Sequence, residues 1–192
     1  MFTLTRQGLI EGVRFLASPN CEERPENTDI SLLVIHNISL PPGQFGSGDI
    51  VDFFLNRLDS GRHPYFRTIC DLRVSAHLLI DRQGEVIQFV PLQQRAWHAG
   101  VSCYEGTENC NDFSIGIELE GCDDEPYTDV QYRLLASISQ LLCEHYPALT
   151  PERICGHSDI APGRKTDPGP AFRWDYFRSL LFAGNESGAT IV

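Results

Sequence analysis

The sequence lacks a surplus of positive charge. It contains 15 lysine and arginine residues against 26 aspartate and glutamate residues, which gives a formal net charge of −11 over 192 residues. A surface that binds nucleic acid or an anionic membrane needs a basic patch. We therefore expect no nucleic-acid partner, although a local basic pocket stays compatible with this composition.

Long apolar runs are also missing. No segment approaches the roughly 20 apolar residues of a membrane-spanning helix. Residues 1–15 show no basic region followed by an apolar run and a small-residue cleavage site, which would mark an export signal. These absences predict a cytoplasmic protein without membrane insertion.

No two cysteines have the Cys-x-x-Cys spacing of a structural zinc knuckle. The chain has seven cysteines, an odd number, and their spacings suggest no disulfide framework. This pattern fits a cytoplasmic location. We interpret most of these residues as small buried hydrophobic side chains.

Internal repeats and low-complexity blocks are absent as well. With 192 residues, of which 42% are hydrophobic and 21% charged, the chain is long enough for one domain with a sizeable core. We predict a single domain over residues 1–192.

Apolar periodicity predicts strands and helices that alternate along the chain, around one mostly central sheet, so the fold class is α/β or α+β. Three polar or glycine-rich segments, 17–30, 59–71 and 96–112, predict loops. Strands are expected at 31–36, 74–80, 85–91, 114–120 and near 153–155, and helices at 48–58, from a Thr128–Gln131 capping box to Tyr146, and at 172–182.

The most informative segment is 156–170, with the sequence Gly-His-Ser-Asp-Ile-Ala-Pro-Gly-Arg-Lys-Thr-Asp-Pro-Gly-Pro. Three prolines and three glycines exclude an ordinary helix or strand, so the segment is predicted to be a shaped loop. Loops of this kind often carry binding and catalytic groups. Here the reactive groups are His157, Lys165 and Asp167.

A catalytic zinc ion typically takes three protein ligands and leaves one position for water. If the strands that end near His36 and His157 are neighbours, both imidazoles project from one sheet edge, and Asp167 can complete the set. Asp159 and Cys155 compete for the third position, and His36 also fits a core histidine. We favour Asp167, because Asp159 suits a turn or helix cap and Cys155 a buried thiol.

Glu118 is unusual for its place in a strand. Ile115 and its alternate neighbours face one way, whereas Ser114 and Gly116 share the face of Glu118 and leave open space beside it. A solvated sheet face is one interpretation. The other is a cleft floor, with Glu118 as a general base and Lys165 as an oxyanion donor or a plain solvated lysine.

Five motifs together resemble the zinc N-acetylmuramoyl-L-alanine amidases, a family that includes phage lysozyme-type amidases and animal peptidoglycan recognition proteins. Residues 164–170 narrow the resemblance to cytosolic amidases of Gram-negative bacteria that act on 1,6-anhydro-N-acetylmuramyl-L-alanine compounds. The similarity runs from about residue 30 to 175. The motifs are 33–37 (Leu-Val-Ile-His-Asn), 74–80 (Val-Ser-Ala-His-Leu-Leu-Ile), 95–100 (Arg-Ala-Trp-His-Ala-Gly), 111–118 (Asn-Asp-Phe-Ser-Ile-Gly-Ile-Glu) and 156–161 (Gly-His-Ser-Asp-Ile-Ala).

The resemblance implies a central mixed β-sheet flanked by helices, with an amidase core at about 30–182. It also implies hydrolysis of the bond between the lactyl group of anhydro-N-acetylmuramic acid and L-alanine, in recycled muropeptides that otherwise signal β-lactamase induction. We expect a monomer with a 1,6-anhydromuropeptide substrate and one Zn²⁺ per chain. The implied residues are His36, His157 and Asp167 as metal ligands, Glu118 and Lys165 as catalytic groups, and Asn37, Arg73, His77 and Trp97 as substrate-binding groups.

One departure from the family pattern concerns substrate binding. Family members carry a basic residue just before the cysteine that corresponds to Cys110, whereas this chain has Asn109. Three rival interpretations stay open. A non-catalytic peptidoglycan-binding module would lack a ligand, an extracellular lytic amidase would need an export route, and a structural-zinc interaction protein would need a fourth ligand, for which Cys155 is the candidate.

Overall fold

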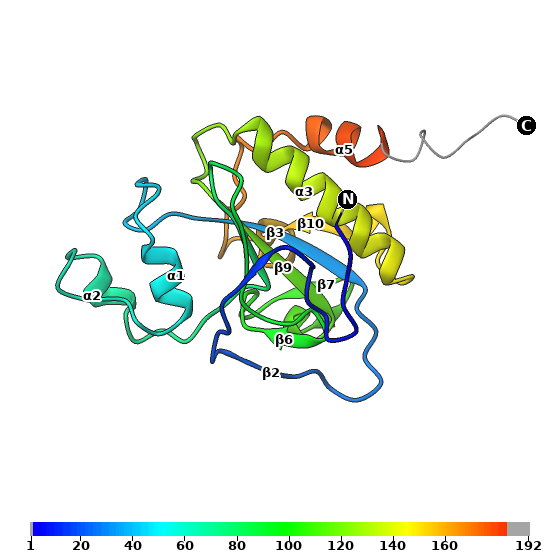
Figure 1. The fold of residues 1–192 in the computed structure, drawn as a ribbon, viewed down its shortest axis with the longest axis horizontal. Coiled ribbons are helices and arrows are strands. Elements are labelled where there is room, and N and C mark those ends of the chain that lie inside the picture. Colours follow the sequence, from blue (N-terminus) through cyan, green and yellow to red (C-terminus); the bar gives the residue numbers. More distant parts are fainter. Residues whose placement is uncertain (1, 184–192) are drawn as a thin grey trace, which may run out of the picture.

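A six-stranded sheet lies at the centre of the computed structural model, which describes residues 2–183 (Figure 1). Four strands run parallel to one another, β5 is antiparallel to β4, and β1 is parallel to β5. The mixed sheet in a single domain confirms the predicted fold class; of the predicted span 1–192, Met1 and residues 184–192 lie outside the described residues. The order is β1 (Arg14–Phe15), β5 (Val86–Gln88), β4 (Leu78–Ile80), β9 (Ser114–Glu120), β3 (Leu32–Ile38) and β10 (Ile154–Gly156).

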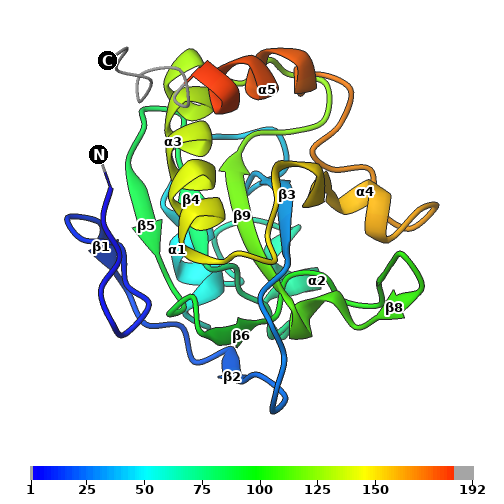
Figure 2. The same cartoon turned by 90° about the vertical axis from the view of Figure 1, so that its right-hand side faces the viewer.

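Helices flank the sheet on both faces. The helices α3 (Asp129–His145) and α5 (Trp174–Ala183) lie together along one face, and α1 (Asp49–Phe54) and α2 (Phe66–Ile69) lie toward the other (Figures 1 and 2). The short helix α4 (His157–Ile160) follows β10. Two small ribbons and two 3₁₀ helices complete the described chain: β2 (Cys21–Glu23) with β6 (Gln94–Ala96), β7 (Cys103–Tyr104) with β8 (Thr107–Glu108), η1 (Cys110–Asp112) and η2 (Pro151–Arg153).

Side chains of β3 and β9 alternate between the two faces, as the period of a strand requires. Leu33, Ile35 and Ile117 pack in the core beneath α3 and α5, whereas Leu32 and Val34 belong to a separate apolar cluster on the opposite face. His36 lies on the same face of the sheet as Leu32 and Val34, and its register partner Glu118 shares that face. The polar groups of the two central strands therefore point away from α3.

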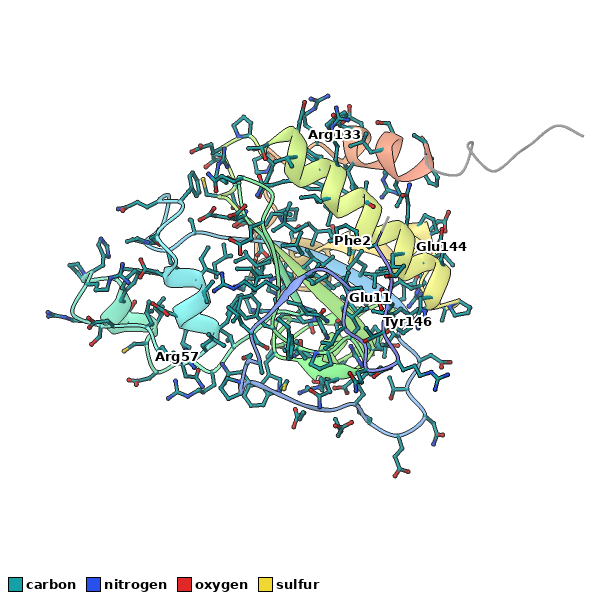
Figure 3. All side chains as sticks on the ribbon, viewed as in Figure 1. Phe2, Glu11, Arg57, Arg133, Glu144 and Tyr146 are labelled. Atoms are coloured by element: carbon teal, nitrogen blue, oxygen red, sulfur yellow. The ribbon has the colours of Figure 1, made fainter. Side chains whose placement is uncertain are left out.

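Helix α3 begins at the predicted capping box. The backbone N–H of Gln131 donates to Thr128 Oγ1, and the Thr128 N–H donates to Gln131 Oε1 at 3.0 Å. Val130, in the first turn of the helix, is 37% exposed and packs over the turn at Gly84. Figure 3 shows Arg133 and Glu144 extending outward from the exposed side of this helix.

Several predicted boundaries are wrong. The helix expected at 48–58 ends at Phe54, because Asn56 adopts a left-handed backbone conformation with φ 57°. Its start is supported by Ser47 Oγ, which accepts a hydrogen bond from the Asp49 N–H at 3.2 Å. The expected loop 59–71 contains α2, and the expected loops 17–30 and 96–112 contain short strands.

The prediction that most cysteines are buried is also wrong. Only Cys110 and Cys155 are buried, Cys103 is exposed, and the other four are partly buried. All seven lie within residues 2–183 and are free thiols. None of the helices in this part of the chain combines the length and apolar character needed to cross a membrane.

Candidate metal and catalytic site

The three predicted metal ligands meet at the carboxyl ends of two neighbouring strands. β10 pairs in parallel with β3, with Gly156 opposite Ile35, so His157 emerges beside His36. The prediction of a loop over the whole of 156–170 is wrong in part. Residues 157–160 form one helical turn before Pro162 and Gly163. The neighbouring strands that the metal hypothesis required are therefore present.

Three donor atoms converge at this point. His36 Nδ1 and His157 Nδ1 are 3.0 Å apart, and each lies 3.1 Å from Asp167 Oδ2. In a tetrahedral zinc site the ligand atoms lie about 3.3 Å from one another. All three side chains are buried, so the group can hold one metal ion.

The competing ligands have other partners. Asp159 Oδ2 accepts a hydrogen bond from the Gly156 N–H at 2.7 Å, which makes it a cap for the turn that carries His157. Cys155 is buried in an apolar cluster with Leu32 and Val34. The geometry therefore favours Asp167 over both alternatives.

Hydrogen bonds on the far side of the rings orient them. His157 Nε2 lies 3.0 Å from the carbonyl oxygen of Ala99. Because a carbonyl only accepts, Nε2 carries the proton and Nδ1 presents a lone pair to the centre of the site. A metal-ligating histidine usually has such a second partner, and His36 Nε2 has one as well, at 2.9 Å from His98 Nδ1.

Burial lowers the pKa of His36 to about 4, so the imidazole is neutral at physiological pH. Burial alone would raise the pKa of Asp167, but hydrogen bonds with His157 and His36 outweigh that effect and lower it. The site thus offers the neutral imidazole of His36 and the carboxylate of Asp167 beside the ring of His157. A cation requires its imidazole ligands to be neutral and its carboxylate ligands to be ionised.

Glu118 lies directly beside the ligands, opposite His36 on the neighbouring strand β9. Burial, with the nearby negative charge of Asp167 as a smaller cause, raises the pKa of Glu118 well above its ordinary value. Its Oε2 has no hydrogen-bond partner among the described residues. The prediction of open space beside Gly116 is wrong. The ring of His98 fills this space, and a Cβ at residue 116 would lie 2.4 Å from that ring.

A cavity of about 360 Å³ opens over this group. It is lined by the three ligands, Glu118 and Lys165, and its opposite wall is apolar, formed by residues of α1, α2 and the segments around them. Lys165 is exposed and reaches the cavity from the loop after α4. The cavity therefore brings together all five residues predicted to bind metal or carry out catalysis.

The four predicted substrate-binding residues separate into two groups. Trp97 and Asn37 line the cavity, and Arg73 lines an adjoining depression of about 220 Å³ together with Trp97 and Lys165. The prediction that His77 lines the groove is wrong. His77 is fully buried, and its Nδ1 accepts a hydrogen bond from the Gly116 N–H, which fixes it inside the sheet region.

Three residues around the site had no predicted role. His98 contacts His36, and Asn111 Oδ1 accepts hydrogen bonds from the backbone N–H groups of both His98 and Ala99. Arg164 donates to the carbonyl oxygen of Ala99, the same oxygen that accepts the hydrogen bond from His157 Nε2–H. All three stand within or beside the motifs, but their spacing carries no signal of these contacts.

The mixed sheet carries at its edge a buried His-His-Asp group of the kind that can hold a metal ion. The chain belongs to the N-acetylmuramoyl-L-alanine amidase family, a class of hydrolases, whose model matches residues 26–170. It is 52% identical to the 1,6-anhydro-N-acetylmuramyl-L-alanine amidase AmpD of Enterobacter cloacae, over 97% of this chain and 100% of that protein. It is 54% identical to the AmpD of Escherichia coli K12, over 93% and 97%. A crystal structure of a selenomethionine AmpD derivative superimposes with a TM-score of 0.90 at 53% identity, covering 93% of this chain and 99% of the other.

Proposed function

We propose that this chain is a zinc-dependent amidase that cleaves the bond between the lactyl group of 1,6-anhydro-N-acetylmuramic acid and L-alanine in muropeptides, during peptidoglycan recycling. One observation carries the proposal: the His36, His157 and Asp167 donor atoms meet on the same cavity as Glu118 and Lys165. The names of the AmpD relatives, at 52–54% identity over nearly their whole lengths, support this choice of substrate.

The three donors would hold one zinc ion per chain. Bound there, zinc supplies Lewis acidity and brings the pKa of water toward about 7. Two imidazoles and one carboxylate are a common ligand set of catalytic zinc. The cavity leaves access to the donors from the side of Glu118 and Lys165.

Glu118 acts as the proton carrier in this proposal. Its carboxylate takes the proton of the attacking water as the new bond to the lactyl carbonyl carbon forms. Lys165 donates a hydrogen bond to the oxygen that becomes negative. Glu118 then returns the proton to the nitrogen of L-alanine as the amide bond breaks, so the carboxylate is regenerated. A raised pKa suits a group that must both accept and release a proton.

The peptide part of the substrate carries carboxylates, and the rim of the cavity offers cations for them in a chain of net charge −11. Arg73 and Arg164 line the adjoining depression beside Lys165. Arg164 also borders a further depression together with Asn109. We propose that Arg164 provides the positive charge that Asn109 does not, with Trp97 and Asn37 contacting the sugar and first residue.

The proposed setting is the cytoplasm. Seven free thiols, one of them exposed, suit a reducing compartment. Removal of anhydromuropeptides there would lower the signal for β-lactamase induction. We propose that the chain acts as a monomer, which sedimentation of the purified protein tests directly.

Incubation with anhydromuramyl-tripeptide, with and without a chelator, tests the activity. Mass spectrometry should detect free tripeptide in the zinc-loaded sample and none after chelation. Absence of free peptide in the zinc-loaded sample would contradict the amidase proposal. Tight zinc binding without turnover would instead favour a structural-zinc protein or a binding module.

A further inference from the structure

His98 lies directly behind the metal ligand His36, on the side away from the donor group. His98 Nδ1 is 2.9 Å from His36 Nε2, and His98 Nε2 is 3.1 Å from Ser114 Oγ. Ser114, His98 and His36 thus form a continuous hydrogen-bonded chain that ends at the metal site. We propose that His98 is a positioning residue that holds His36 in either of its two neutral tautomers, so that His36 is oriented both before and after a metal binds.

In the metal-free site, His36 Nδ1 faces two acceptors. His157 Nε2 donates to the carbonyl oxygen of Ala99, so in this tautomer His157 Nδ1 is an acceptor, as is the Asp167 carboxylate. His36 Nδ1 lies 3.0 Å from His157 Nδ1 and 3.1 Å from Asp167 Oδ2, so a proton on His36 Nδ1 can be donated to them. His36 Nε2 is then bare, and it accepts a hydrogen bond from His98 Nδ1–H while Ser114 donates to His98 Nε2.

A metal ligand at His36 Nδ1 requires the opposite arrangement. Nδ1 must lose its proton, and the neutral ring then carries its proton on Nε2. His98 serves this state by accepting at Nδ1 and donating from Nε2 to Ser114 Oγ. In this change the His36 Nδ1 proton is released to solvent, the His98 Nδ1 proton passes to His36 Nε2, and His98 Nε2 takes up one proton from solvent, so the two rings keep two protons in total.

The position of His98 is built by two further contacts. A Cβ at residue 116 would lie 2.4 Å from the His98 ring, so Gly116 leaves the place that the ring occupies. The Asn111 side chain accepts from the backbone N–H groups of His98 and Ala99, at 3.1 and 2.8 Å. Both ring nitrogens of His98 are engaged, Nδ1 with His36 and Nε2 with Ser114.

This inference rests on the proposed metal site, and nitrogen NMR of the histidine rings tests it in the unaltered protein. Metal-free protein should carry the His98 proton on Nδ1 and the His36 proton on Nδ1. Addition of zinc should move both to Nε2. If zinc binds but the His98 proton keeps its place, the relay is wrong while the metal site stands; if zinc does not bind at all, the metal site itself is wrong.

Two variants measure the contribution of His98 to zinc affinity. His98→Phe keeps a planar ring but removes the partner of His36 Nε2, and zinc should bind about 10–100-fold more weakly. His98→Asn offers an amide that can turn to accept or donate, and it should lose no more than about threefold. Competition with a coloured chelator gives the affinities, and thermal unfolding of the metal-free variants checks that both fold.

Equal losses in the two variants, at equal folded stability, would reduce His98 to a packing residue and overturn the proposal. A His98→Phe protein with unchanged zinc affinity would overturn it as well. Should His98→Phe fail to fold, the NMR comparison in the unaltered protein still decides the question.

Discussion

His36 and Glu118 are register partners in the parallel pairing of β3 and β9, so their side chains project side by side. Strand register and the two-residue period of a β-strand fix both side chains on the face away from α3. The proposed ligand His36 and the proposed base Glu118, placed on rigid, paired strands, keep a nearly constant separation. Asp167 and Lys165 instead come from a loop, which is anchored where Tyr127 Oη and Asn37 Nδ2 both donate to the carbonyl oxygen of Pro168.

Replacement of Asp167 tests the metal group. Asp167→Asn keeps the shape but removes the charge and should weaken zinc binding by more than about 100-fold, because an outer partner alone accounts for about 10–100-fold. Asp159→Asn in the same segment is the matched control, since Asp159 caps the Gly156 N–H. Elemental analysis should find about one zinc per chain in the control. Equal zinc content in both variants would contradict the proposed ligand set.

Glu118 should lower the stability of the metal-free protein above a certain pH. Its folded-state pKa lies well above the ordinary value of 4.5 because of burial, so ionisation disfavours the folded state. Stability therefore falls as pH rises from the unfolded pKa through the raised folded pKa, and then stays constant. Glu118→Gln cannot ionise, and it should unfold at higher temperature than the original protein at pH 8 but at the same temperature near pH 4.

Thermal unfolding in the presence of a chelator gives this comparison, and 1 kcal/mol corresponds to about 2–4 °C for a chain of this size. Glu120→Gln is the matched control on the same strand and face. Glu120 accepts hydrogen bonds from the backbone N–H groups of Gly46 and Arg82, so its replacement should lower the unfolding temperature. Stabilisation by both variants, or by neither, would contradict the assignment of Glu118 as an unpaired buried carboxylate. Glu118→Gln should retain zinc and lose most turnover.

The sequence predicted the central strands and the long helix because their local signals agree with their tertiary setting. Alternation in 114–120 and the Thr128–Gln131 capping box each act over a few residues. The ends of α1 depend on the backbone of Asn56, and α2 is only four residues long. The short ribbons are held by pairing between distant segments, such as Cys21 opposite Ala96, which periodicity within one segment cannot reveal.

The prediction of the site was most accurate for histidines that stand at or near the carboxyl end of an apolar strand. His36 lies near the carboxyl end of β3 and His157 follows β10, and parallel pairing brings these two ends together. His77 and His98 both stand in the motifs, but their surroundings differ. His77 is buried and accepts a hydrogen bond from the Gly116 N–H, whereas the His98 ring occupies the space that a side chain at residue 116 would take. Which histidine faces the cavity depends on the path of residues 96–112, and that path is set by Asn111 and by Arg24, which donates to the carbonyl oxygens of Asn111 and Asp112.

Lys165 should contribute to turnover without holding the metal. It lines the cavity beside Asp167 and Glu118 but makes no contact that fixes a donor atom. Removal of an oxyanion donor typically costs about 10²–10³ in kcat, so Lys165→Met should show such a loss with unchanged zinc content. Lys165→Arg keeps the charge and should recover part of the rate. A kcat for Lys165→Met within about threefold of the original would exclude the oxyanion role.

The cysteines should react with iodoacetamide in an order set by exposure. Cys103 is exposed and should be alkylated first. Cys155 is buried, and burial, with the charge of Asp159 as the next cause, raises its pKa to about 12. At pH 8 only about one Cys155 in ten thousand is then a thiolate, the reactive form. Peptide mapping by mass spectrometry should find Cys155 unmodified in the folded protein and modified after unfolding in denaturant. Modification of Cys155 as fast as Cys103 in the folded protein would mean that the apolar cluster beside the proposed metal ligands opens readily. The three donor residues would then lack the rigid support that a metal site requires.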